Sequence, residues 1–209
     1  MSSFLVINDV SKAIRAILVA GFAADPQTRS DGGTEDDITF ASPRDAKPTS
    51  ASQALKGNIS LFLYQVEENE FLKAQSMLPT GTPGQLRHPP LSLNLRYLLT
   101  PIMNDPDKNQ ILLGRAMQVL RENTSMTGPF APVAPGVSPD VRVLFDPLSF
   151  EELTRLWSAM SEPYRLSVCY EARVVALPSS RAEVRAPMVE RRHVDVRQIV
   201  GNNATDGSS

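Results

Sequence analysis

The chain carries few side chains that are suited to act as nucleophiles, acids, bases or metal ligands. Its 209 residues include two histidines, His88 and His193, and a single cysteine, Cys169. Neither histidine has a partner at metal-ligand spacing, and one cysteine cannot complete a Cys/His zinc set. A cysteine inside an alternating apolar segment is typical of a small buried residue. We therefore predict no metal, no cofactor and, with one cysteine, no intramolecular disulfide.

Two pairs of adjacent acids, Glu67-Glu68 and Asp36-Asp37, are the remaining candidates for acid–base chemistry. Adjacent residues at a strand end point to opposite faces, so Glu67 and Glu68 are poorly placed to share one site. The sequence also lacks the P-loop, the G-x-G-x-x-G loop and the G-x-S-x-G elbow. We predict that the protein is not an enzyme. A small enzyme that uses Cys169 or an acid pair is the alternative from another class.

Charge and hydropathy exclude two further classes. The net charge of −2 and the pI near 5.7 argue against a nucleic-acid partner, which would favour a strongly basic face. The apolar segment near the N-terminus is too polar to be a signal peptide or to span a bilayer, because it is interrupted by Asn8, Asp9, Lys12 and Arg15. We expect a protein made and folded in a cytoplasm, with no membrane insertion.

The elements that must position any functional surface begin with two strong strand patterns. Residues 59–66 are apolar on both faces, which predicts a strand that is covered on both sides. Residues 91–99 alternate between apolar and polar side chains, which predicts a half-buried strand. The segment between them, 79–90, is rich in proline and glycine and ends in the pair Pro89-Pro90. We predict a stiff turn there.

Helix signals surround these strands. Residues 3–22 have the periodicity of an amphipathic helix, Asp105-Pro106 is a good helix start, and Ser149 with Glu152 forms a capping box. Further strands are predicted over 37–41, 141–145 and 166–177, with loops over 24–36 and 124–140. Because strands follow one another without regular helices between them, we predict an α+β fold, with a mixed or antiparallel sheet and about three helices.

We predict one domain over residues 1–200 and a disordered tail over 201–209. Within the domain, residues 179–200 form an extended arm, with a weak strand pattern over 189–199. Such an arm is able to add a strand to a neighbouring protein. The alternative is an edge strand of the same chain.

Four segments together resemble a known family. In order, they are ISLFLYQVEENEFLK, HPPLSLNLRYLLTP, NQILLGRAMQVL and LSFEELTRLWSAMSEPYRLSVCYEARVVAL. This ordered set is similar to the DUF4255 family, the N-terminal domain of the tail-terminator or cap protein of extracellular contractile injection systems. The resemblance spans about residues 5–195.

The resemblance implies a phage tail-terminator-like subunit with a structural role. Such a subunit closes into a six-membered ring, caps the inner tube and sheath of a phage-tail-like particle, and stops their polymerisation. The alternative within the same particle is a baseplate or sheath-associated adaptor. On this interpretation the chain's partners are itself, tube and sheath. Its candidate partner-binding residues lie at the double proline and in the arm: Pro89, Pro90, Val189, Arg191, Arg192, Val194 and Val196.

Overall fold

Helix α1, Val6–Ala24, opens the fold after a 3-10 turn at Ser3–Leu5. Its buried positions Val10, Ile14, Leu18 and Phe22 recur every four residues, so the helix presents one apolar stripe to the sheet. The predicted helix over 3–22 is thereby confirmed. The computed structural model describes residues 3–46, 57–73, 76–79, 85–127, 140–181 and 183–185.

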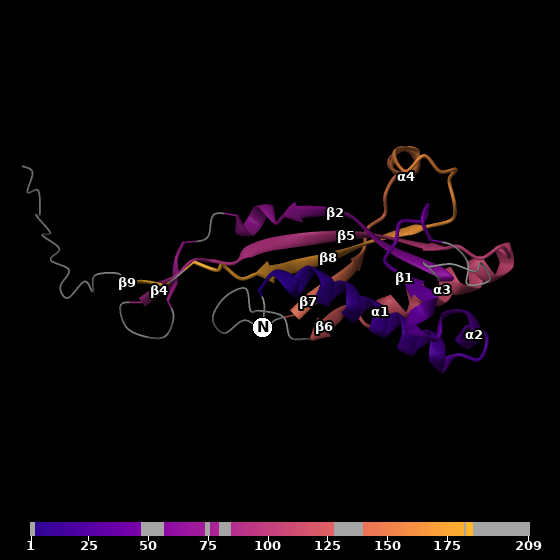
Figure 1. Cartoon of the computed structure of the whole chain (residues 1–209), viewed down its shortest axis with the longest axis horizontal. Helices are drawn as coiled ribbons and strands as arrows, with labels where there is room; N and C mark the ends of the chain where they lie inside the picture. The colour runs from indigo at the N-terminus through magenta and orange to yellow at the C-terminus, as the bar shows by residue number, and fades with distance from the viewer. Residues whose placement is uncertain are drawn as a thin grey trace, which may run out of the picture.

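A six-stranded sheet forms the centre of the molecule, in the order β1-β2-β5-β8-β7-β6 (Figure 1). β1 runs parallel to β2, and every other neighbouring pair is antiparallel, so the sheet is mixed. With its helices this makes the α+β fold that the sequence predicts. The strands are β1 (Ile38–Thr39), β2 (Ile59–Glu68), β5 (Leu91–Pro101), β6 (Ser125–Thr127), β7 (Asp140–Phe145) and β8 (Val168–Leu177).

Both edges of this sheet are short strands. β1 pairs with only Ile59 and Ser60 of β2. At the other edge, β6 pairs with only the first half of β7, Asp140–Arg142. Most of β2 and the end of β7 therefore have no further strand beside them within the described part of the chain.

Helices α1 and α3 cover one face of the sheet (Figure 1). α3, Pro106–Glu122, begins as predicted: the Asp105 side chain accepts hydrogen bonds from the backbone N–H groups of Asp107 and Lys108, at 3.0 and 3.4 Å. The two helices cross closely at Gly21, whose carbonyl oxygen accepts hydrogen bonds from the Arg115 guanidinium at 2.9 and 3.2 Å. This crossing fixes the position of α3.

Helix α4, Phe150–Ala159, lies on the opposite face of the sheet (Figure 1). The predicted capping box is present, because Ser149 and Glu152 each bond the other's backbone N–H. Trp157 is buried in a second, smaller apolar cluster with Leu98 of β5 and Cys169 of β8. The single cysteine is therefore a core residue, as predicted, and the single tryptophan is a core residue as well.

The strand patterns need two corrections. β2 is not covered on both sides along its length, because Val66 is 46% exposed. A register shift between Leu63 and Gln65 interrupts the alternation before that point. β5 is not half-buried throughout either, since Tyr97–Pro101 are all buried. The two helical layers cover opposite faces of this part of the strand.

The sequence analysis did not predict several short elements. A second sheet of three strands, in the order β3-β4-β9, consists of β3 (Leu78–Pro79), β4 (Gln85–Arg87) and β9 (Val184–Arg185). β6 lies in the predicted loop 124–140, and a four-residue helix, α2 (Arg29–Gly32), lies in the predicted loop 24–36. Elements of two to four residues are too short to show a period, so hydropathy does not reveal them.

The second sheet lies at one end of the molecule, next to the first residues of β5 and the last residues of β8 (Figure 1). β9 falls inside the predicted arm and pairs antiparallel with β4. The start of the arm is therefore an edge strand of the same chain. Residues 186–200 of the arm and the tail 201–209 lie outside the described residues.

Candidate functional site

Of the side chains considered for catalysis, Cys169 and Asp37 are buried, and Glu67 and Glu68 are in ion pairs. Within the described ranges, no group of three or more His, Cys, Asp or Glu side chains is placed to hold a metal ion. Cys169 is buried, and this burial raises the pKa of its thiol to about 11. The thiol is therefore protonated and shielded at neutral pH, which is the opposite of an activated nucleophile.

The acid pair at the end of β2 makes two separate ion pairs. Glu67 contacts Arg96 of β5 at 3.3 Å, and Glu68 contacts Lys73 at 3.5 Å. Asp37 is mostly buried and accepts hydrogen bonds from the Thr34 backbone and hydroxyl, at 2.9 and 2.6 Å. These carboxylates hold local structure, and the geometry gives no acid–base pair.

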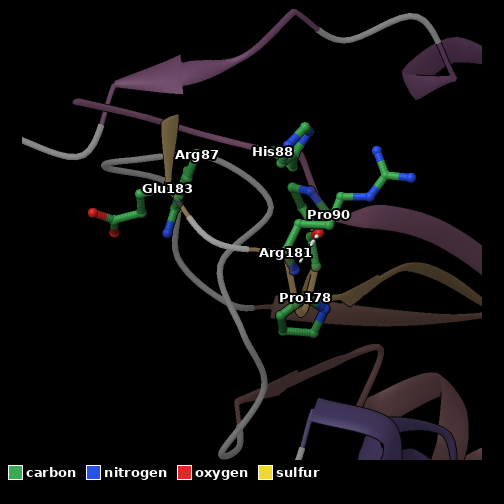
Figure 2. Close-up of a pocket in the computed structure, with 7 residues that line it drawn as sticks. Arg87, His88, Pro90, Pro178, Arg181 and Glu183 are labelled. Carbon is green, nitrogen blue, oxygen red and sulfur yellow. Dashed lines mark hydrogen bonds between the residues drawn. The ribbon is translucent and has the colours of Figure 1, made fainter. Parts of the chain in front are cut away.

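The double proline lies in the neck between the two sheets. Pro89 and Pro90 connect β4 to β5, and Pro178 follows the end of β8, which returns toward β9. Because proline fixes the backbone φ angle, both connections that pass through the neck, from β4 to β5 and from β8 to β9, are stiffened there. Figure 2 shows Pro90 and Pro178 in the wall of the same hollow.

This neck hollow has a volume of about 180 Å³ and an excess of positive charge. Arg87, His88 and Arg181 line it with one acid, Glu183, and with Pro90, Pro178 and Ser179 (Figure 2). The Nε of Arg87 is buried and has no hydrogen-bond partner in the described part of the protein. Guanidinium groups bind carboxylates strongly, so the hollow is suited to an acidic side chain of a partner.

A second exposed surface surrounds α4. Phe150, at the first turn of the helix, is 72% exposed and packs edge-on against Tyr164, with ring centroids 5.6 Å apart. Tyr164 in turn packs against Trp157 at 6.2 Å. An aromatic pair on a stable helix start is a surface that is able to contact another protein.

A charged group lies on the face of the sheet that α4 covers. Arg96 Nη1 lies 3.4 Å from Asp146 Oδ2. Burial works against the charge on Arg96, but Asp146 and Glu67 outweigh it and raise the pKa of the guanidinium. Burial is also the main cause that raises the pKa of the Tyr64 hydroxyl. Sequence reasoning missed this group; its only signal is an arginine inside an apolar strand.

Of the predicted partner-binding residues, the structure describes only the double proline. Pro90 lines the neck hollow, and Pro89 precedes it. The other five candidates fall outside the described residues: Val189, Arg191, Arg192, Val194 and Val196. Arg87 and Arg181 were not predicted, although both flank the proline-rich turns of the neck.

Comparison with solved structures places the fold among terminator proteins. A structure described as a sheath/tube terminator of the PVC extracellular contractile injection system, in the extended state, matches 93% of this chain and 64% of its own, with TM-score 0.57 and 21% identity. The anti-feeding prophage cap, a tube terminating cap, matches 90% of this chain and 60% of its own, with TM-score 0.54 and 18% identity. The chain thus spans less than two thirds of either protein.

None of the helices in the described ranges has the length and apolar character needed to cross a membrane. A search of curated proteins finds no match to the chain.

The sequence itself identifies the family. The profile of the Pvc16 N-terminal domain matches residues 9–191, which is most of the chain. This range contains all the elements described above except the first residues of α1 and the turn before it. The protein belongs to the family of Pvc16 N-terminal domains.

Proposed function

We propose that this protein caps the inner tube and sheath of a contractile injection particle and stops their growth. The observation that carries the proposal is the fold match, over at least 90% of the chain, to a sheath/tube terminator and to a tube terminating cap. Membership of the Pvc16 N-terminal domain family supports the same role. The proposed activity is one of assembly and needs no catalytic site.

The cap is proposed to be a ring of six copies, as the resemblance to tail terminators implies. A closed ring needs one contact that repeats head to tail, with a different surface of the subunit on each side. The central sheet is suited to this because its two edges differ and both are short strands. Helices α1, α3 and α4 hold this sheet from both faces and make the subunit rigid.

Contacts to tube and sheath are proposed for the neck and the arm. The neck hollow presents Arg87 and Arg181 to an acidic group, beside the stiff pair Pro89-Pro90. Beyond β9, the arm residues Val189, Arg191, Arg192, Val194 and Val196 are proposed to add an extended segment to a sheath subunit. Preformed turns lose little conformational entropy on docking, which favours binding at the neck.

The proposal is tested by deleting the gene in a strain that makes the particles. Particles without the protein are expected to show tubes of uncontrolled length or to fall apart, and the wild-type gene restores a narrow length distribution. Electron microscopy measures both. Particles of normal length with a normal cap after deletion contradict the proposal. A tagged protein found at the baseplate end would instead indicate an adaptor.

A further inference from the structure

The most exposed large apolar side chain in the described part of the protein is Phe71, at 95% exposure. It lies in η3, the 3-10 turn Glu70–Leu72 directly after β2. Leaving a phenylalanine in water forgoes the free energy of burying it, so this position is suited to a contact that another molecule completes.

The turn that carries Phe71 is fixed to the sheet. Asn69, at its N-terminus, is buried, and its side chain accepts a hydrogen bond from the Phe71 backbone N–H at 3.1 Å. The Asn69 amide donates to the Asn94 side chain at 3.1 Å, and its backbone N–H donates to the carbonyl of Ser92 at 2.8 Å. Phe71 is thus presented on a rigid base rather than on a loose loop.

An apolar groove lies toward the other edge of the sheet, between α3 and the end of β7. It has a volume of about 390 Å³. Its lining is mostly apolar and comes from the end of α3 and from β7 and β8: Met117, Gln118, Leu120, Arg121, Thr124, Val143, Leu144, Phe145 and Tyr170. Phe145 is half-exposed and packs edge-on against Tyr170 at 5.7 Å, so one aromatic wall is already ordered.

The turn and the groove lie toward opposite edges of the six-stranded sheet. η3 follows β2, whereas the groove is beside β7, and both β5 and β8 stand between these strands. Three strand spacings separate β2 from β7 by roughly 14 Å. One subunit therefore cannot place its own Phe71 in its own groove. A contact between them repeats in one direction from copy to copy, which is the geometry that closes a ring.

Charge complements this geometry. Glu70 precedes Phe71 and has no ion pair among the described residues, whereas Glu67 and Glu68 are already paired with Arg96 and Lys73. Arg121 is the one charged residue that lines the groove, and it too has no ion pair within the described ranges. The carboxylate of Glu70 and the guanidinium of Arg121 therefore have opposite charges, and each is left to be paired by another copy.

We propose that adjacent copies of this chain join by inserting Phe71 of one copy into the α3–β7 groove of the next, with Glu70 beside Arg121. This inference rests on the proposed ring and names the contact that builds it. The occupant of the groove is thus a second copy, and the same contact recurs around the ring.

The first test uses charge exchange in the full-length protein, produced together with tube and sheath subunits. Glu70→Arg alone and Arg121→Glu alone place like charges together, so each weakens the association of copies. The double variant E70R/R121E restores an opposite pair and is expected to restore the ring. Phe71→Ser is expected to weaken each contact roughly ten- to a hundredfold. Phe4→Ser, at an exposed phenylalanine near the N-terminus that is not part of the proposed contact, is the matched control and leaves the ring intact.

The second test detects the contact directly in assembled particles. Cys169 is buried, so cysteines that replace Glu70 and Arg121 are the reactive thiols in the described part of the chain. A short bis-maleimide is expected to link E70C/R121C into a ladder of covalent oligomers, while either single variant gives no ladder. The control pair E151C/R121C, which joins the α4 surface to the groove, also gives none.

The outcomes separate this contact from the proposed function. A ladder from E70C/R121C and rescue by E70R/R121E support the contact. Normal rings in Phe71→Ser and Glu70→Arg, or no ladder in particles of normal length, overturn it while the capping role stands. Normal particles after deletion of the gene instead overturn the capping role.

Discussion

The crossing of α1 and α3 makes a quantitative prediction, because it is set by one glycine. A methyl group added at Gly21 would lie 2.3 Å from Val119 Cγ2 and 2.7 Å from Cγ1. Ordinary carbon–carbon contacts are roughly 3.5–4.0 Å, so the helices would have to separate. Val119 cannot easily turn away, because a β-branched side chain has one strongly preferred rotamer in a helix. Gly114, in the same helix α3, has nothing within 4 Å of the corresponding position.

The two glycines therefore give a matched pair of variants. Replacing a glycine inside a helix with alanine raises the free energy of unfolding by about 1 kcal/mol, so Gly114→Ala should stabilise the protein by that amount. Gly21→Ala has the same favourable effect on the helix, but overpacking against Val119 lowers the free energy of unfolding by about 1–3 kcal/mol. The variants should differ by that cost, which corresponds to roughly 2–12 °C in Tm at about 2–4 °C per kcal/mol. Differential scanning calorimetry at one protein concentration measures the difference.

A double variant isolates the contact. Val119→Ala removes both methyl groups that the new side chain would meet, so Gly21→Ala in that background should be neutral or stabilising. An increase in Tm from Gly21→Ala equal to that from Gly114→Ala, in the wild-type background, would refute the close crossing. The position of α3, and with it the groove beside β7, would then need revision.

The remaining predictions concern α4, the buried thiol and the arm. Ser149→Ala should cost about 1 kcal/mol in urea unfolding, and Ser149→Asp should recover most of it, because the hydroxyl caps α4. Burial raises the pKa of Cys169 to about 11 from 9.0, so its contribution to stability is full below pH 9 and falls as pH rises toward 11. Cys169→Ala should reduce that alkaline loss, and an unchanged pH profile would contradict the assignment. Truncation after Arg185 keeps β9 and should leave the circular dichroism spectrum folded while sheath binding is lost; unchanged binding would exclude the arm.

The sequence predicted well what depends on local patterns. The capping box at Ser149, the aspartate cap at Asp105 and the four-residue period of α1 are all signals within one or two helical turns. Each is confirmed by the hydrogen bonds or burial in the structure. The long strands were also found, because ten or more residues of apolar pattern are difficult to mistake.

Features that depend on distant parts of the chain were missed. The burial of both faces of β5 arises from α1 and α3 on one side and α4 on the other, which no local pattern contains. β4 and β9 are short and become strands only by pairing across almost a hundred residues. The exposure of Phe71 was likewise invisible, because an aromatic beside acids predicts neither a core position nor a presented one.

The candidate site was predicted only in part for the same reason. Pro89-Pro90 stood out through its composition, and Pro90 does line a hollow of the structure. Arg87 and Arg181 reach that hollow from segments that are distant in sequence, so the chain's order gives no sign of their proximity. The positive charge of the neck is a property of the folded chain.

A reconstruction of the terminal layers of the particle by electron cryomicroscopy tests the central claim most directly. We expect the end of the tube and sheath opposite the baseplate to close with a ring of six copies of this fold. In that ring the sheet edges should be joined side to side, with the neck directed at tube or sheath. A particle end that closes without this protein, or density for its fold only at the baseplate, would contradict the capping role.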